Sequence, residues 1–268
     1  MKLYEFSQGR TPLFISMPHD GTRIPGDLEA RMTKRALQRP DTDWHVARLY
    51  QFAQDLEASL IRPLYHRYVV DLNRAPDDTT LYAGSSKTEV CPSSCFDDSP
   101  IYRDGAVPNA TEVAERIDTY WRPYHQRLQQ ELARIRNAHG VALLYEAHTI
   151  RSRVLRFFEG VLPDFNLGTA DGTSCAPALT QRFADQLAQI EEYTYIVNGR
   201  FKGGYITRAY GKPEDNIHVM QLELSQRTYM DEDYPYTYRE QLAQQVQPAL
   251  KSVLATMLKW ADAAKPSA

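Results

Sequence analysis

Two histidines and two acidic residues occur at places in this 268-residue sequence where they could form a hydrolytic metal site. His19 and His148 each follow an apolar run that predicts a buried strand. Asp43 begins a helical pattern, and Glu223 lies near the end of a third apolar run. Two histidines and one carboxylate are the ligands of an open catalytic zinc site, in which the fourth position is left for water. Zinc lowers the pKa of that water to about 7, and a further carboxylate can then take its proton.

Each of these residues also has a purely structural explanation. Asp43 could cap its helix, and His19 could be a turn residue that ends its strand. Glu223, like Glu146 in another apolar run, could pair with a buried arginine, and His148 could be a core histidine with satisfied hydrogen bonds. From the chemistry of the residue types alone, a metal site and these structural explanations are about equally supported.

Other histidines compete as metal ligands, because the candidates lie far apart in the sequence and spacing cannot select three of them. His45 is the strongest competitor, since it neighbours Asp43. His139 stands beside a helix-ending glycine and is interpreted as a residue that interacts with the helix dipole. The remaining competitors are His66, His125 and His218. The choice between Asp43 and His45 is open at this point.

Several arginines on predicted loops or strand ends indicate an anionic substrate. They are Arg74, Arg208 and the cluster of Arg151, Arg153 and Arg156. Arginine binds carboxylates through two parallel hydrogen bonds of fixed geometry. Several arginines around one pocket would suit a small dianionic ligand, although Arg151 and Arg153 could equally be solvated surface charges.

The predicted elements bring the strand-end residues to one edge of a sheet. Helices are expected to begin near Asp43, Asn109, Ala176 and Thr237, with a kink near Trp121 caused by Pro123. Strands are expected at 13–17, 68–74, 141–146, 195–197 and 217–224, with a further strand and turn within 157–169. This alternation predicts one α/β domain over residues 1–268, with an open, mixed and mostly parallel sheet and helices on both faces. In such sheets, ligands bind beyond the carboxyl ends of the strands.

The segment 77–108 shows no sustained periodicity, which is typical of a functional loop or lid. Cys91 and Cys95 lie within it, and Cys175 is the only other cysteine. With only one more cysteine, far away in the sequence, Cys91 and Cys95 are interpreted as free thiols rather than as a zinc site. The odd number also argues against a disulfide framework and favours the reducing cytosol.

Composition excludes several classes of partner. The formal net charge is −3 and the basic residues are scattered, so no nucleic-acid surface is expected. No window approaches 18 continuous apolar residues, and the first residues lack the features of a signal peptide. We therefore expect a cytoplasmic protein that has no membrane segment and no obligate protein partner.

Six blocks of sequence, in order along most of the chain, carry a family resemblance. They are MPHDG at 17–21, DTDWH at 41–45, DLNR at 71–74, EAHTIRS at 146–152, NGRFKGGYITR at 198–208 and QLEL at 221–224. Together they resemble the N-formylglutamate amidohydrolases. The resemblance implies a zinc-dependent hydrolase with a carboxypeptidase-like α/β fold. Its reaction would be the last step of a histidine-degradation route, which releases formate and L-glutamate from N-formyl-L-glutamate.

Carried over residue by residue, the resemblance implies one zinc ion (Zn²⁺) per chain. Its ligands would be His19, Asp43 and His148, and Glu223 would be the general base. The carboxylates of a small dianionic N-acyl amino acid are then expected at Arg74 and Arg208, with three nearby residues as helpers: Asn73, Lys202 and Tyr205.

Two features depart from the family pattern. Ala209 follows Arg208 where a histidine is expected, and the stretch 84–98 is unlike the family. Two other functions therefore remain under consideration. One is a zinc amidohydrolase for another N-acyl amino acid or a small peptide. The other is a metal-free binding or sensor protein that retains the fold.

Overall fold

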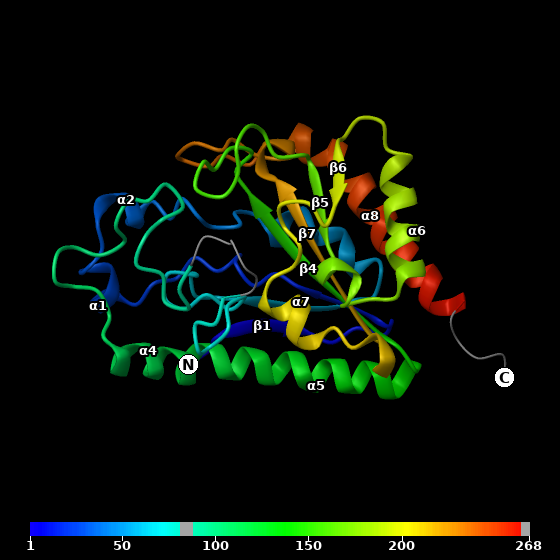
Figure 1. Ribbon diagram of the computed structural model, residues 1–268, viewed down its shortest axis with the longest axis horizontal. Coiled ribbons are helices and arrows are strands. Elements are labelled where there is room, and N and C mark those ends of the chain that lie inside the picture. The colour runs from blue at the N-terminus through cyan, green and yellow to red at the C-terminus, as the bar shows by residue number, and fades with distance from the viewer. Residues whose placement is uncertain (81–87, 264–268) are drawn as a thin grey trace.

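The structure is a computed structural model that describes residues 1–80 and 88–263. Within these ranges, seven strands form one sheet in the order β1-β3-β2-β4-β7-β5-β6 (Figure 1). The strands are β1 (Tyr4–Ser7), β2 (Leu13–Ser16), β3 (Ser59–Pro63), β4 (Ala142–Ile150), β5 (Phe165–Gly168), β6 (Tyr195–Val197) and β7 (Ile217–Ser225). Only the β1–β3 and β5–β7 pairs are antiparallel. The predicted α/β fold with a mixed, mostly parallel sheet is confirmed.

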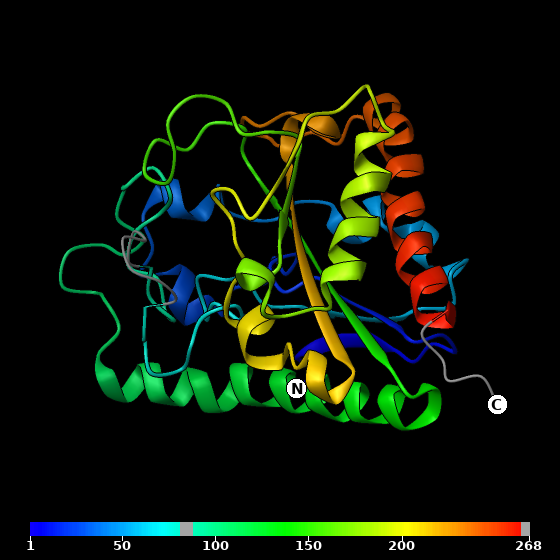
Figure 2. The same cartoon turned by 45° about the vertical axis from the view of Figure 1, so that its right-hand side comes forward.

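Helices cover both faces of the sheet, as predicted. Phe14 in β2 packs in the core beneath α5 (Arg122–His139), whereas its neighbours Leu13 and Ile15 belong to the core beneath α6 (Pro177–Ala188) and α8 (Glu240–Ala263). This alternation follows from the strand geometry, which turns successive side chains to opposite faces. In Figure 2, α5 runs along one side of the sheet, and α6 and α8 lie side by side on the other. No helix in the described ranges has the length and apolar character that crossing a bilayer requires.

The prediction of a strand at 68–74 is wrong. These residues form turns, and β3 takes the sheet position between β1 and β2. Val69 and Val70 are nevertheless buried, and the backbone N–H of Asp71 donates to the carbonyl of Val90 in another loop. An apolar run reports burial, and here the buried backbone satisfies its hydrogen bonds in turns rather than in a ladder.

The helix predicted from Asp43 is much shorter than expected. It consists of α3 (Val46–Leu49), followed by the 3₁₀ turn η1 (Gln51–Gln54). His45 is at its N-cap position with φ 65° and makes no capping bond, and the N–H of Ala47 in the first turn donates to Oδ1 of Asp20 instead. Asp43 therefore does not cap the helix, and its carboxylate is available for other contacts.

The later helices agree well with the sequence. Asn109 caps α4 (Ala110–Arg116) by accepting a hydrogen bond from the N–H of Glu112. A π-helical turn, η2 (Ile117–Trp121), interrupts the helix just before Pro123, where a kink was predicted. The short helices α1 (Gly26–Glu29) and α2 (Lys34–Leu37) lie in the connection after β2, and α7 (Tyr205–Tyr210) precedes β7. The remaining 3₁₀ turns are η3 (Ala170–Gly172), η4 (Pro213–Asp215) and η5 (Gln226–Thr228).

Two predicted positions change because elements are longer or differently placed. Strand β4 continues to Ile150, so His148 lies inside a strand and not after its end. Arg208 and Tyr205, predicted on a loop, lie on α7. Part of the segment 77–108, residues 81–87, lies outside the described residues, and the prediction that this segment is a lid stays a prediction.

Candidate active site

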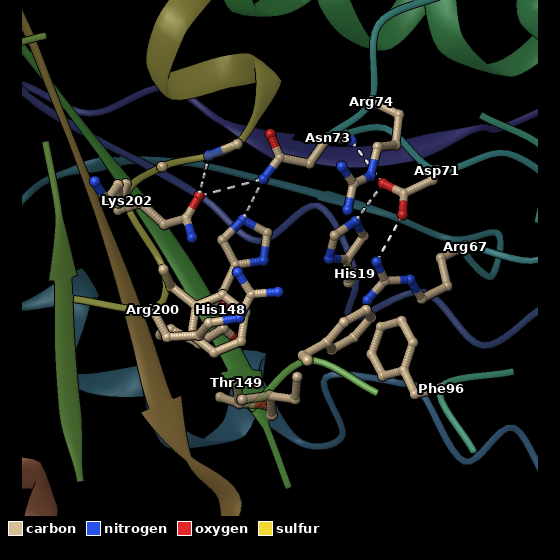
Figure 3. Close-up of a pocket in the computed structure, with 17 residues that line it drawn as sticks. His19, Arg67, Asp71, Asn73, Arg74, Phe96, His148, Thr149, Arg200 and Lys202 are labelled. Atoms are coloured by element: carbon tan, nitrogen blue, oxygen red, sulfur yellow. Dashed lines mark hydrogen bonds and ion pairs between the residues drawn. The ribbon is translucent and has the colours of Figure 1, made fainter. Parts of the chain in front are cut away.

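A pocket lies beyond β2 and along the carboxyl-terminal parts of β4 and β7. His19 follows β2, His148 projects from β4, and Glu223 projects from β7 into the same pocket. Figure 3 shows the two histidines near the centre of the pocket, with cationic side chains on both sides of them. The pocket therefore brings together residues that are far apart in the sequence, and it lies at the edge of the sheet where the prediction placed the ligand.

His19, Asp43 and His148 bring three possible ligand atoms within 4.8 Å of one another. Oδ2 of Asp43 lies 3.2 Å from Nδ1 of His148 and 3.8 Å from Nδ1 of His19. All three side chains are buried. Two imidazole nitrogens and one carboxylate oxygen, directed at one point, fit a zinc ion with a position left open for water.

His45, the competing ligand, is directed elsewhere. Its Nε2 lies 2.8 Å from the carbonyl oxygen of Tyr236, and its ring contacts Tyr238 edge-on. Three other histidines bond to groups outside the cluster: His66 to Thr42, His125 to Tyr210 and the Leu72 carbonyl, and His218 to the backbone of Ala176. The geometry thus selects Asp43 over His45, although metal binding itself stays a prediction.

Asp71 and Arg67 form a buried pair behind His19 that the sequence analysis missed. Oδ1 of Asp71 lies 2.7 Å from Nε2 of His19, and its Oδ2 accepts a hydrogen bond from Arg67 at 2.6 Å. Burial alone would raise the pKa of Asp71, but the charge of Arg67 and the contact with His19 hold it well below its ordinary value. A carboxylate on Nε2 fixes the ring so that Nδ1 faces Asp43.

The pKa values of the two histidines are displaced in opposite directions. Burial, followed by the charge of Arg67, lowers the pKa of His19 to about 4, so this ring is neutral and able to bind a metal. Burial would also lower the pKa of His148, but its contacts with Asp43 and Glu146 outweigh this effect and raise it to about 10. Metal binding at His148 would have to displace the Nδ1 proton.

Glu223 is suited to accept and return a proton. Its Cα pairs with that of His148 across β4 and β7, and its side chain is 8 % exposed. Burial raises its pKa to about 8. A general base works best when its pKa lies near the operating pH, because it then both takes and releases a proton.

Cationic side chains lie on two sides of the pocket. Figure 3 shows Arg67 and Arg74 on one side and Arg200 and Lys202 on the other, with the histidines between them. Arg200 was not selected as a site residue, although it belongs to the block 198–208. Its Nε is buried without a hydrogen-bond partner, and Nζ of Lys202 lies 3.0 Å from Asp171. An arrangement with cations on both sides suits a ligand that carries two anionic groups.

Three of the predicted substrate residues support the pocket from behind. Asn73 accepts a hydrogen bond from the N–H of Ile206 through Oδ1, and its carbonyl accepts one from the N–H of Tyr205. Gly204 lies so close to Asn73 that a Cβ would come within 2.4 Å of Nδ2, which only glycine allows. Tyr205 packs against Trp121, and Nε of Arg208 donates to the Gly203 carbonyl. Asn73 also lines the pocket, whereas Tyr205 and Arg208 are not among the described residues that line it.

The arginine cluster after β4 and the cysteines lie apart from this chemistry. Arg151 pairs with Asp233, and Arg156 donates to Ser94 and to the Cys95 carbonyl. All three cysteines are free and buried, and the prediction that Cys91 and Cys95 are free thiols is confirmed. Phe96 is a residue of the segment 77–108 that borders the pocket, where its ring lies beneath the Arg67 guanidinium.

A family model described as N-formylglutamate amidohydrolase matches residues 11–230. This chain belongs to that family. Two curated relatives, both named N-formylglutamate deformylase, come from Pseudomonas putida and Pseudomonas aeruginosa. Each is 48 % identical to this chain over 259 residues, with 97 % of both chains covered. The amidohydrolase resemblance seen in the sequence is therefore confirmed.

Solved structures agree with this family assignment. The crystal structure of an N-formylglutamate amidohydrolase from Ralstonia eutropha JMP134 matches with a TM-score of 0.83 and 25 % identity, over 98 % of both chains. A gene product of Agrobacterium tumefaciens matches with a TM-score of 0.70 and 18 % identity, over 98 % of this chain and 97 % of the other. The second match shows only that the fold of this chain also occurs at lower sequence identity.

Proposed function

We propose that this chain hydrolyses the formyl amide of N-formyl-L-glutamate to formate and L-glutamate, with a zinc ion held by His19, Asp43 and His148. One observation carries the proposal: a single pocket is lined by His19, His148 and Glu223 with cations on two sides, and Asp43 lies against both histidines. Membership of the N-formylglutamate amidohydrolase family and the names of the two Pseudomonas relatives support the substrate.

The donor set fits the proposed metal. Asp43 does not cap α3, and His45 bonds to the carbonyl of Tyr236 instead. The possible ligand atoms of His19, Asp43 and His148 therefore lie together, and His45 does not compete with them. A zinc ion bound there would supply Lewis-acid polarisation of the formyl carbonyl and would lower the pKa of bound water. Asp71 holds the ring of His19 in the orientation that this role needs.

The chain's own residues account for the proton transfers. Glu223 takes a proton from the attacking water as the water oxygen bonds to the formyl carbon. Glu223 then gives that proton to the amine nitrogen as the carbon–nitrogen bond breaks, which leaves formate and the free amino acid. Arg67, which lines the pocket beside the histidines, is the cation placed to stabilise negative charge on the former carbonyl oxygen.

The two carboxylates of the substrate bind the cations of the pocket wall in this proposal. Arg74 lies on one side, and Arg200 and Lys202 lie on the other. Arg208, Asn73 and Tyr205 act indirectly, because they hold the Gly203–Gly204 backbone against the pocket. We further propose that the reaction ends a histidine-degradation route in the cytosol, which the three free cysteines support.

Metal analysis combined with a substrate panel tests the proposal. Purified protein should hold about one zinc per chain, lose activity with a chelator and regain it with zinc. Formate release should be fastest from N-formyl-L-glutamate, compared with N-acetylglutamate, N-formylaspartate and N-formylglutamine. Full activity after complete metal removal would disprove the metal role. A preference for an acetyl group or another amino acid would instead redirect the substrate assignment.

A further inference from the structure

Glu146 on β4 is a buried carboxylate whose function the proposed reaction does not explain. Its side chain is 0 % exposed, and neither carboxyl oxygen has a hydrogen-bond partner in the described structure. Burying such a group without a partner is costly, so nearly all buried polar groups in proteins are paired. A buried carboxylate that makes no hydrogen bond, beside a candidate metal site, therefore suggests a partner to which it bonds when the site is in use.

The ring of His148 lies against this carboxylate. Glu146 and His148 are two residues apart on β4, so both side chains project from the same face of the sheet. Oε2 of Glu146 lies 3.6 Å from Nε2 of His148, just beyond hydrogen-bond distance. A small rotation of either side chain would bring the two atoms into contact.

Asn73 occupies the other approach to Nε2 of His148, but it presents the wrong group. Its Nδ2 lies 2.9 Å from Nε2. The amide orientation is set on both sides, because Oδ1 accepts from the N–H of Ile206 at 2.9 Å and Nδ2 faces Oε1 of Gln221 at 3.4 Å. Asn73 therefore offers N–H donors to the ring of His148 and cannot accept its proton.

A metal on Nδ1 changes what Nε2 requires. Nδ1 is the atom of His148 that faces Asp43, so Nδ1 is the metal-binding nitrogen, and the only proton of the neutral ring is then on Nε2. That proton needs an acceptor, which is usually a carboxylate, a backbone carbonyl or a water. Asn73 cannot supply one, whereas Oε2 of Glu146 can.

We propose that Glu146 is a positioning residue that accepts the Nε2 proton of His148 and thereby holds Nδ1 toward the metal. The inference rests on the proposed zinc site and deepens it. His19 provides a parallel within the same pocket, because its Nε2 already contacts Asp71 at 2.7 Å. Each histidine ligand would then have its own buried carboxylate on the side away from the metal.

Zinc affinity of Glu146 variants tests this proposal. Glu146→Met removes the acceptor but keeps the volume, and it should raise the zinc dissociation constant about 10- to 100-fold in competition with a chromophoric chelator. Glu146→Gln should retain most of the affinity, because Oε1 of glutamine still accepts. The midpoint of thermal unfolding without zinc is measured for both variants, so that zinc affinities are compared between folded proteins. Glu131→Gln, which removes another buried carboxylate whose partners are Ser59 and Arg134, should leave zinc affinity unchanged.

Proton and nitrogen NMR of the zinc-loaded protein gives a second measurement that needs no methionine variant. Wild-type protein labelled with ¹⁵N-histidine should show a proton on Nε2 of His148, and this resonance should move upfield in Glu146→Gln. If Glu146→Met bound zinc with wild-type affinity, or if the His148 resonance were unchanged in Glu146→Gln, the proposed role of Glu146 would be wrong, but the zinc site would stand. Wild-type protein that binds no zinc would overturn the proposed metal site and this inference together.

Discussion

Glu223 and His148 are Cα partners across the parallel strands β4 and β7. The register therefore places the proposed general base beside a proposed metal ligand, although the two residues lie far apart in the sequence. Both side chains are buried, and burial raises the pKa of Glu223 to about 8. This relationship makes it possible to separate proton transfer from metal binding by mutation.

Replacing Glu223 by glutamine should abolish most turnover without removing the metal. The amide has nearly the same shape but cannot take a proton, and general base catalysis contributes about 10²- to 10⁴-fold to a rate. Formate release should therefore fall by that factor while zinc content stays near the wild-type value. Glu192→Gln, at an exposed residue, is the matched control and should behave as wild type. Wild-type turnover in Glu223→Gln would remove Glu223 from the mechanism.

Replacing Asp71 by asparagine should weaken both metal binding and the fold. Oδ1 of Asp71 contacts Nε2 of His19 and the N–H of Asn73, and Oδ2 contacts Arg67, so the amide nitrogen of the variant must face one of these two sides. Loss of a carboxylate behind a ligand histidine typically costs about 10- to 100-fold in metal affinity. Loss of one partner of a buried ion pair costs about 3–5 kcal/mol in the free energy of unfolding.

Chelator competition and urea denaturation measure these two effects of Asp71→Asn. Asp77→Asn is the control, because Asp77 is exposed and only six residues away along the chain. Its free energy of unfolding should stay within about 0.5 kcal/mol of wild type. If Asp71→Asn bound zinc with wild-type affinity, the contact between Asp71 and His19 would have no part in positioning the ligand.

Arg74 and Arg200 should each contribute to substrate binding, and a substrate pair can assign their roles. A hydrogen bond to a charged group contributes about 1.5–3 kcal/mol, so Arg74→Met and Arg200→Met should lower kcat/KM about 10- to 100-fold. The variant that has lost the partner of the side-chain carboxylate should no longer distinguish N-formylglutamate from N-formylglutamine. Arg182→Met, on the exposed face of α6, should leave both substrates unaffected. If neither variant changed this preference, the carboxylates would bind elsewhere.

The central strands could be predicted from sequence because they are buried on both faces. Residues 13–16, 142–146 and 217–224 form nearly continuous apolar runs, and all three lie in the middle of the sheet. The run at 68–72 has the same composition but forms turns, because apolar residues signal burial rather than a hydrogen-bonding pattern. Strand β3 was missed because its buried and half-buried residues alternate and include Arg62.

The candidate site was predicted in part, for a similar reason. His19, Asp43, His148 and Glu223 could be selected because their types suggest a zinc hydrolase and their sequence blocks resemble one family. Arg67 and Asp71 were missed because their importance lies in contacts with His19 and with each other, which spacing does not reveal. Glu146 was noted only as a buried acid, and its lack of a partner is visible only in three dimensions.

The stability of the fold should depend on pH through His125, which is not one of the proposed metal ligands. Its ring stacks on Trp121, its Nε2 lies 2.9 Å from the Leu72 carbonyl, and its Nδ1 lies 2.8 Å from the Tyr210 hydroxyl. A neutral ring satisfies both contacts, with Nε2–H donating to the carbonyl and Nδ1 accepting from the hydroxyl. Burial lowers the pKa of His125 to about 3.

A lowered histidine pKa makes the folded state less stable in acid. Between pH 3 and the ordinary histidine pKa of about 6.5, the unfolded chain binds a proton that the folded chain does not. The contribution of His125 is therefore complete above about pH 6.5 and declines as the pH falls through this window. For one proton, the decline approaches about 1.4 kcal/mol per pH unit.

Urea denaturation between pH 4 and pH 7.5 should show this linkage as a difference between wild type and His125→Gln. The variant should have a lower free energy of unfolding than the wild type at pH 7.5. This difference in free energy should become smaller as the pH falls, because only the wild type loses the contribution of His125. Tyr210→Phe is the matched control: it removes the hydroxyl bonded to Nδ1 but keeps the titrating ring. Its free energy of unfolding should be lower at every pH, with a pH dependence close to that of wild type. The difference in the free energy of unfolding between wild type and His125→Gln could instead stay constant with pH. That result would show that the buried ring takes up its proton as readily as it does in the unfolded chain.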